Sequence, residues 1–310
     1  GSNSLKAVVK SVGPGELVCL YKKTYCVPED FHDSRYDPSF SPLCYPGQTV
    51  HASVYLPEYG PDCQAAVYVR DRRCGESLAG EPVRLERGKW TELSYRIPGG
   101  TASLLEEAGV QFELFPEAGP EFTAFLDDLW IEGKPDYRVD FSQEQEEVWT
   151  NSHREISQFS KLKGLSYLES GELHLSCGDF GELYTGHHDW EDYEAVFAFT
   201  PLTGEWHGVN VRVQGAVRSY AAALLPGGKA ALVKNENGYR TLAEAPFPWK
   251  PGQEVTVRVT VQGGSLRAEF EGGPVLTAED SGRVYHRGCI GLSVREGSHL
   301  KCRLLSVRGL

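Results

Sequence analysis

Short runs of alternating apolar and polar residues recur along the whole chain, and they constrain the fold more than any other feature. In the cleanest run, residues 253–262, four valines occupy every second position and polar residues occupy the positions between them. This period of two is typical of a β-strand with one buried face. Turn-forming glycine and proline, 34 and 18 residues in all, separate the runs. The pattern predicts an all-β protein.

The strand-like runs form two groups, separated by the turn-forming sequence Gly133-Lys134-Pro135. A chain of 310 residues is longer than one typical domain, and each group holds enough runs for a sandwich. We therefore expect two tandem antiparallel β-sandwiches of the jelly-roll kind, covering residues 1–135 and 136–310. Two segments break the rhythm. Residues 102–108 suggest a short helical turn, and the proline- and aromatic-rich residues 24–47 suggest a long loop that either binds a ligand or covers a core edge.

The formal net charge of −12 and the absence of basic stripes argue against nucleic acid as a partner. No apolar run is long enough for a membrane-spanning helix, so no membrane insertion is expected.

Methionine is absent, and Gly1-Ser2 resembles the remnant of a cleaved tag. We therefore expect a piece of a larger protein, with a catalytic domain of that protein as one partner.

The eight cysteines contain no C-x-x-C pair and divide five and three between the halves, so they cannot all pair within their own domains. This favours reduced thiols and a cytoplasmic location over an extracellular one. A bridge from Cys44 to Cys19 or Cys26 remains open.

Residues 208–235 contain two back-to-back alternating runs that suggest a ligand site. If the valines of the first run and the small residues Ser219, Ala221 and Ala223 point inward, a three-residue loop sets Arg212 opposite Tyr220. The result is a solvent-exposed polar face, which is either a ligand platform or an ordinary solvated surface. The residues predicted to bind ligand are Arg212, Tyr220, Gln214, Arg218, Trp206, His207 and Lys234.

The second half resembles the concanavalin A-like, laminin-G-type jelly roll, in the version found in 3-keto-disaccharide hydrolase-like domains. The resemblance is carried by residues 190–194, 208–212, 218–221, 229–234, 262–263 and 288–292. Residues 234–243 also resemble the accessory C-terminal region of bacterial ADP-ribosylglycohydrolase-family proteins. These resemblances imply a bacterial carbohydrate-binding accessory domain.

The first half is similar to a carbohydrate-binding module of the galactose-binding type, on the evidence of residues 88–97 and 125–131. In those modules a closing pair of aspartates often lies near a structural calcium ion. The resemblance therefore implies calcium ligands at Asp127 and Asp128, and no cofactor is otherwise required. Aromatic residues suit sugar binding because they offer flat apolar surfaces. The candidates in this half are Tyr55, Tyr59, Tyr68 and Trp90, but we expect Trp90 and Trp130 to be core residues.

Two further groups invite a chemical interpretation. Asp192 and Glu194 share one face of a predicted strand, and paired carboxylates can hydrolyse glycosidic bonds. His187, His188 and Asp189 suit zinc, but their spacing favours loop residues without a metal.

The sequence therefore predicts a non-catalytic accessory region that binds a glycan or a sugar-like ligand such as an ADP-ribosyl group. One alternative is a glycoside hydrolase that uses Asp192 and Glu194 as acid and base. The other is a scaffold that packs on a catalytic domain.

Overall fold

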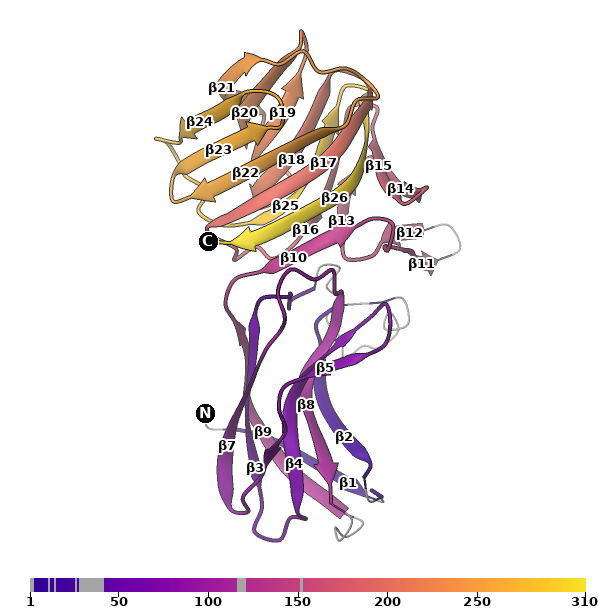
Figure 1. Ribbon diagram of the computed structural model, residues 1–310, viewed down its shortest axis with the longest axis vertical. Coiled ribbons are helices and arrows are strands. Elements are labelled where there is room, and N and C mark those ends of the chain that lie inside the picture. Colours follow the sequence, from indigo (N-terminus) through magenta and orange to yellow (C-terminus); the bar gives the residue numbers. More distant parts are fainter. Residues whose placement is uncertain are drawn as a thin grey trace. The chain divides into compact units, whose positions relative to one another are not determined.

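The computed structural model describes residues 3–10, 12, 13, 15–25, 27, 42–115, 121–150 and 153–310, with the side chains of residues 149, 150 and 153 left out. The described residues form β-strands and turns without a helix, so the predicted all-β fold is confirmed. No segment of this part of the chain could therefore cross a bilayer as a helix. The strands divide between two compact units, one ending at Pro135 and one running from Asp136 to Leu310 (Figure 1).

The first unit is a sandwich of two antiparallel sheets. The four-stranded sheet has the order β1 (Leu5–Lys10), β9 (Glu121–Glu132), β3 (Thr49–Leu56) and β7 (Lys89–Arg96). The five-stranded sheet has the order β2 (Leu17–Lys23), β8 (Leu105–Leu114), β4 (Cys63–Asp71) and β5 (Ser77–Ala79), and β6 (Val83–Arg84) also pairs with β4.

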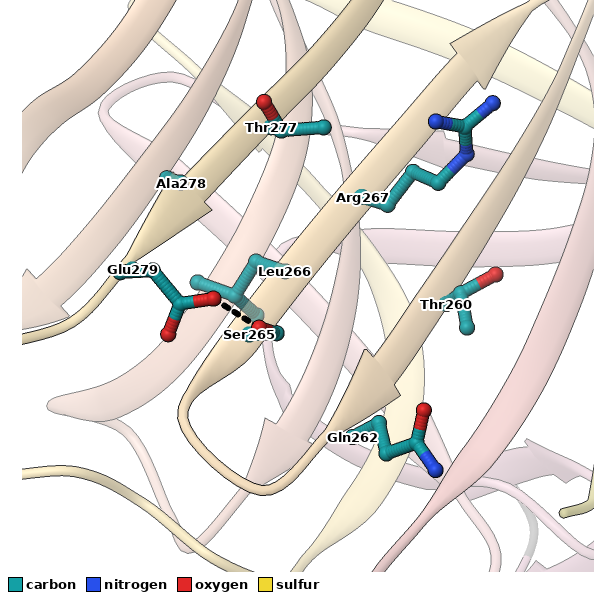
Figure 2. A pocket seen from close by; sticks show the side chains of 8 residues that line it. All are labelled: Thr260, Gln262, Ser265, Leu266, Arg267, Thr277, Ala278 and Glu279. Carbon is teal, nitrogen blue, oxygen red and sulfur yellow. Dashed lines mark hydrogen bonds between the residues drawn. The ribbon is translucent and has the colours of Figure 1, made fainter.

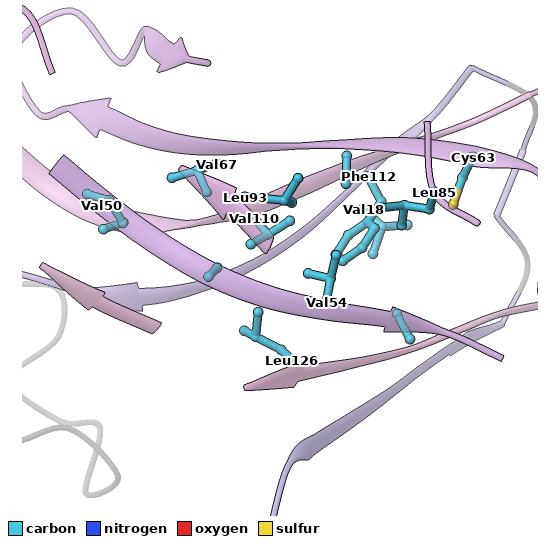
Figure 3. Packing of buried hydrophobic residues seen from close by; sticks show 14 of the residues in the cluster. Val18, Val50, Val54, Cys63, Val67, Leu85, Leu93, Val110, Phe112 and Leu126 are labelled. Carbon is cyan, nitrogen blue, oxygen red and sulfur yellow. The ribbon is translucent and has the colours of Figure 1, made fainter. Parts of the chain in front are cut away.

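Alternate residues of these strands meet in one apolar core. Val50 and Val54 of β3 face Val110 and Phe112 of β8, and all four are fully buried (Figure 3).

The prediction of a helical turn at residues 102–108 is wrong, because Leu105 already begins β8, which pairs with β2 on one side and β4 on the other. Pairing on both edges overrides the local helix preference of the sequence. Most of the predicted loop at residues 24–47 lies outside the described residues.

The second unit is a larger sandwich. Its eight-stranded sheet has the order β14 (Leu165–Glu169), β15 (Glu172–Ser176), β26 (His299–Gly309), β17 (Tyr193–Thr203), β22 (Val255–Gln262), β23 (Ser265–Phe270) and β24 (Val275–Glu279), and β10 (Asp136–Asp140) also pairs with β26. Its seven-stranded sheet has the order β13 (Ser160–Lys163), β16 (Phe180–Thr185), β25 (Cys289–Arg295), β18 (Trp206–Val213), β19 (Arg218–Leu225), β20 (Lys229–Glu236) and β21 (Tyr239–Pro246). A separate hairpin joins β11 (Glu146–Thr150) to β12 (His153–Ile156).

The two large sheets form the two layers of this unit (Figure 1). Their facing sides are apolar, as the fully buried Val209 and Leu292 of one sheet and Phe197 and Val257 of the other show. The opposite side of the seven-stranded sheet, which we call its outer face, carries many small residues. That face positions the site described below.

Seven of the eight cysteines lie in the described part of the chain, and all seven are free thiols. The bridge between Cys19 and Cys44 is therefore not formed, and Cys26 lies outside the described residues.

The first unit should depend strongly on its central aromatic pair. Phe112 is fully buried and its ring centroid lies 5.0 Å from that of Phe122. We expect Phe112→Ala to lower the free energy of unfolding by about 3–5 kcal/mol, because the lost contacts leave a cavity. Val83→Ala is the control, since Val83 is 42% exposed and should change little. Urea unfolding measures both, and equal losses would contradict this account of the core.

Candidate functional site

The hairpin of β18 and β19 differs from the predicted register by one residue. Val211, not Arg212, lies opposite Tyr220, whereas Gln214 still bonds to the backbone of Arg218. The extra residue forms a β-bulge, and Arg212 there adopts a left-handed backbone with φ of 48°. Because Tyr220 is paired with a core valine, its side chain also points inward. The predicted exposed platform is therefore wrong.

Arg212 is 1% exposed and binds the chain itself. Its Nη2 donates to Asp192 Oδ1 at 2.9 Å and its Nε donates to the carbonyl of Glu191 at 3.2 Å. Its Nη1 donates to the carbonyls of Gly263 and Tyr285. Arg212 thus donates four hydrogen bonds to three separate segments of the chain. Its role is to hold these segments together, and its guanidinium is not available to a ligand.

Lys234 and Tyr220 hold the connection between β24 and β25 in the same way. Lys234 Nζ lies 2.7 Å from Asp280 Oδ2, and both side chains are almost completely buried. The Tyr220 hydroxyl donates to Asp280 Oδ2 at 2.6 Å and accepts the backbone N–H of Tyr285 at 3.0 Å. Lys234 and Tyr220 were predicted to bind an external ligand, but they bind residues 280–285 of the same chain. Predicted ligand residue His207 is also buried, and its Nε2 lies 2.9 Å from the carbonyl oxygen of Thr203.

The carboxylates of the hydrolase alternative are both occupied. Asp192 Oδ1 accepts from Arg212 and from the backbone N–H of Gly263, each at 2.9 Å. Glu194 is paired with Arg258 across the strand. Both carboxylates therefore have structural partners within the sheet and its turns.

The residues proposed to bind metal ions give little support to a metal site. Asp127 Oδ1 accepts the backbone N–H of Asp128 at 2.9 Å, and within the described ranges no third acidic, histidine or cysteine ligand completes a group with them. A calcium ion there stays a prediction. His187, His188 and Asp189 have potential ligand atoms within 4.8 Å of one another, but Asp189 is also 2.9 Å from Arg287.

The outer face of the seven-stranded sheet brings together aromatic residues from three strands that are distant in sequence. We call Tyr184, Trp206 and Tyr239 the aromatic face. The register places Tyr184 of β16 opposite Gly291, and Trp206 of β18 opposite Arg295. Trp206 packs against Tyr239 of β21 with ring centroids 4.8 Å apart. All three rings are partly exposed.

Small residues form the floor beneath these rings. A Cβ atom at Gly208 would lie 2.8 Å from Cη2 of Trp206, and one at Gly291 would lie 2.4 Å from Cδ1 of Tyr184. Both rings therefore occupy space that a larger side chain at these two positions would fill. Beyond them the floor consists of buried small residues, which are Ala221, Ala223, Ala231 and Val233.

A buried polar cluster fixes the orientation of the rings. Asn210 Nδ2 lies 3.1 Å from the Tyr239 hydroxyl, and Asn210 Oδ1 accepts from Ser293 at 2.5 Å. The Tyr184 hydroxyl donates to Glu182, which is only 2% exposed. Burial raises the pKa of the Glu182 carboxyl, although hydrogen bonds from tyrosines and the charge of Arg295 oppose this. These side chains are positioning residues, because the rings cover them.

A depression of about 550 Å³ adjoins Tyr184, and Gln214, Arg218, Arg287 and His188 also line it. Two predicted ligand residues, Gln214 and Arg218, are therefore exposed here, and Trp206 lies partly exposed on the same face. The sequence did not single out Tyr184 or Tyr239. The signal that could have found them is the small residue at positions 208 and 291, where strands usually carry larger side chains.

The outer face of the eight-stranded sheet has a different character. A depression of about 390 Å³ lies over β22, β23 and β24, and Figure 2 shows the side chains that line it. Ser265 bonds to Glu279 there, and Arg267 lies 2.9 Å from Glu269. None of the described residues that line it is aromatic. It has the composition of an ordinary solvated sheet surface.

The ion pair of Lys234 and Asp280 should contribute strongly to stability. We expect Lys234→Met to lower the free energy of unfolding by about 3 kcal/mol, because it removes the buried cation of Asp280. The carboxylate then keeps only the half-exposed Arg240, whose Nη2 lies 3.4 Å from Asp280 Oδ1. The control is Lys229→Met at the other end of β20, where an exposed pair with Glu244 should contribute about 0–1 kcal/mol. Denaturant unfolding compares the two, and a similar effect of both would contradict this account.

Asp280 should also set part of the acid sensitivity. Burial raises the pKa of its carboxyl, but hydrogen bonds from Lys234 and Tyr220 outweigh burial, so the pKa lies below its ordinary value. Its stabilising contribution is therefore complete above the unfolded-state pKa and is lost as the pH falls through the folded-state pKa. We expect Asp280→Asn to be less stable at neutral pH and to lose less stability on acidification. Thermal unfolding as a function of pH tests this, and parallel curves for the two proteins would contradict it.

No protein-family model matches the chain, and no curated protein matches it. Several solved structures resemble part of it. The carbohydrate-binding module CBM66 from Bacillus subtilis is 16% identical, covers 48% of this chain and 95% of its own, and has a TM-score of 0.44. A Bacillus subtilis protein of unknown function with a galectin-like fold is 12% identical, covers 49% and 89%, and has a TM-score of 0.40. The exoplasmic/lumenal domain of VIP36 in its Ca²⁺/Man3GlcNAc-bound form is 14% identical, covers 50% and 84%, and has a TM-score of 0.40. These comparisons assign the chain to no family and give no support to the resemblance to ADP-ribosylglycohydrolase-family proteins.

Proposed function

We propose that the second unit binds carbohydrate, and that it does so on the aromatic face rather than through Arg212 and Tyr220. One observation carries this proposal. Three partly exposed rings lie on a floor of small residues and are held in place by a buried cluster of amide, hydroxyl and carboxyl groups. Flat apolar rings with polar edges suit the C–H faces and hydroxyl groups of a sugar.

The depression beside Tyr184 adds polar groups at one edge of this surface. Arg218, Arg287 and Gln214 line it and offer hydrogen-bond donors to hydroxyl or carboxylate groups of a glycan. The rings would supply most of the contact area, and these side chains would select among sugars. A surface of this kind is shallow, so we expect modest affinity for a single sugar unit.

Binding without hydrolysis is the better supported activity. Of the carboxylates on the outer face, Glu182 lies on β16 and Glu244 lies five strands away on β21. At about 4.8 Å per strand they are about 24 Å apart, whereas a glycosidase pair is about 5–9 Å apart. We therefore propose a non-catalytic module that serves a catalytic domain elsewhere in a longer protein.

Trp206→Ala tests the site directly. We expect it to weaken binding to any glycan that the wild-type chain recognises by about tenfold or more, because it removes the central ring. Leu165→Ala on β14 is the control, since Leu165 is 60% exposed but lies on the other sheet. A glycan array followed by calorimetry measures both. Absence of binding to every saccharide would overturn the proposal and leave the scaffold alternative, which light scattering and a pull-down with the rest of the parent protein would examine.

Gly208→Ala tests the floor beneath the ring. The added methyl group would meet Trp206 and the Ser293 hydroxyl, each 2.8 Å away, and both side chains can move. We expect the fold to survive and the affinity to fall, because the indole is lifted from its seat. Calorimetry with the glycan identified on the array measures the change, and unchanged affinity would show that the ring position is not important.

A further inference from the structure

The first unit carries a second aromatic surface, on the side of its four-stranded sheet that faces away from the core. Trp90 and Trp130 were expected in the core, but they are 49% and 47% exposed. The reason is strand alternation. Val50, Ala52, Val54 and Leu56 of β3 point inward, so Tyr55 and His51 point outward, and so do their partners Trp90 and Trp130.

Each exposed indole is supported by a ring of β3. The ring of His51 stacks on Trp130 with centroids 4.2 Å apart and planes within 10°, and Glu132 holds His51 Nε2 at 2.9 Å. Tyr55 lies 5.5 Å from Trp90. The indoles are therefore oriented before any ligand arrives, and they remain half exposed.

Polar acceptors lie between the two indoles. Ser53 is paired with Glu92 of β7 on one side and with Asp127 of β9 on the other, and its hydroxyl donates to Glu92 at 2.8 Å. Glu92 is exposed and Asp127 is partly exposed. A row of carboxylates thus separates Trp90 from Trp130.

The spacing of the indoles sets the size of the ligand. Their partners on β3 are four residues apart, which is about 13 Å along the strand, and they lie on opposite sides of it, about 10 Å apart across the sheet. A ligand in contact with both must span about 16 Å. One monosaccharide cannot do this, whereas an extended oligosaccharide can.

The chemistry of the row argues against other occupants. The cores of protein interfaces are depleted of charged residues, and a protein laid over this row would have to bury charged carboxylates. An anionic polymer would be repelled, because residues 1–135 contain 20 acidic and 13 basic residues. A neutral sugar chain stacks its C–H faces on the indoles and donates its hydroxyl groups to the carboxylates.

We propose that this face of the first unit is a second glycan-binding site, which takes a neutral oligosaccharide of several sugar units extended between Trp90 and Trp130. It is distinct from the aromatic face and does not depend on it. The two sites together would give the chain two points of attachment to a polysaccharide.

The test uses the full chain carrying Trp206→Ala, so that binding at the aromatic face does not contribute. Affinity electrophoresis in gels that contain mixed-linkage β-glucan, arabinoxylan or galactan should show retardation by at least one of these neutral polysaccharides. Adding Trp90→Ala or Trp130→Ala should weaken that interaction about tenfold or more, and adding Tyr21→Ala should not. Tyr21 is the control because it is 50% exposed but lies on β2, in the other sheet of this unit.

Four results would overturn the proposal. The first is that none of the three polysaccharides retards the Trp206→Ala chain, and the second is that retardation survives both tryptophan variants. The third is an equal loss with Tyr21→Ala, and the fourth is binding of a cationic peptide such as oligolysine in place of the glycans. Circular dichroism confirms folding of each variant, and Glu92→Gln, which keeps both rings, should weaken retardation without affecting the fold. Because wild type and Trp206→Ala are compared first, failure of this site is distinguished from failure of the aromatic face.

Discussion

The larger sandwich depends on the oxygen atoms that bind two buried cationic side chains. Arg212 and Lys234 project between the sheets at one end, where water cannot solvate them. An unpaired charge in that position would cost several kcal/mol, so the chain must supply oxygen atoms. Asp192, Asp280 and the carbonyl of Tyr285 do so, and they come from segments far apart in sequence. The connection between β24 and β25 is thereby fixed across the end of the sandwich.

This arrangement gives the two faces of the seven-stranded sheet different roles. The inner face provides the apolar core and, at its end, the ionic contacts that close the sandwich. The outer face makes none of these ionic contacts, and its small residues leave room for aromatic rings. Tyr184, Trp206 and Tyr239 come from β16, β18 and β21, so the sheet, and not any single loop, assembles the site. A rigid sheet is a good base for a surface whose geometry must not change.

Much of the fold could be predicted from the sequence because the period of two is a direct signature of strands. The register of the hairpin formed by β18 and β19 could not be predicted in this way. β19 carries small or apolar residues on both faces, so alternation does not say which face is inward, and the bulge at Arg212 shifts the pairing by one residue. The site was predicted only in part for a related reason. Trp206 was a predicted ligand residue, but Tyr184 and Tyr239 join it on one face only through sheet pairing. For Trp90 and Trp130, side-chain size suggested burial. The alternation of β3, whose outward-pointing residues Tyr55 and His51 lie opposite them, indicates exposure instead.

The close contact of Trp206 with Gly208 has a consequence for how a sugar would associate. The ring rests on backbone that is hydrogen-bonded to strands on both sides, so it has little freedom left to lose. No loop has to close and no rotamer has to be selected before contact. The rate-determining step of association would then be the removal of water from the indole and from the sugar. The backbone of the sheet would differ little between the free and the sugar-bound protein.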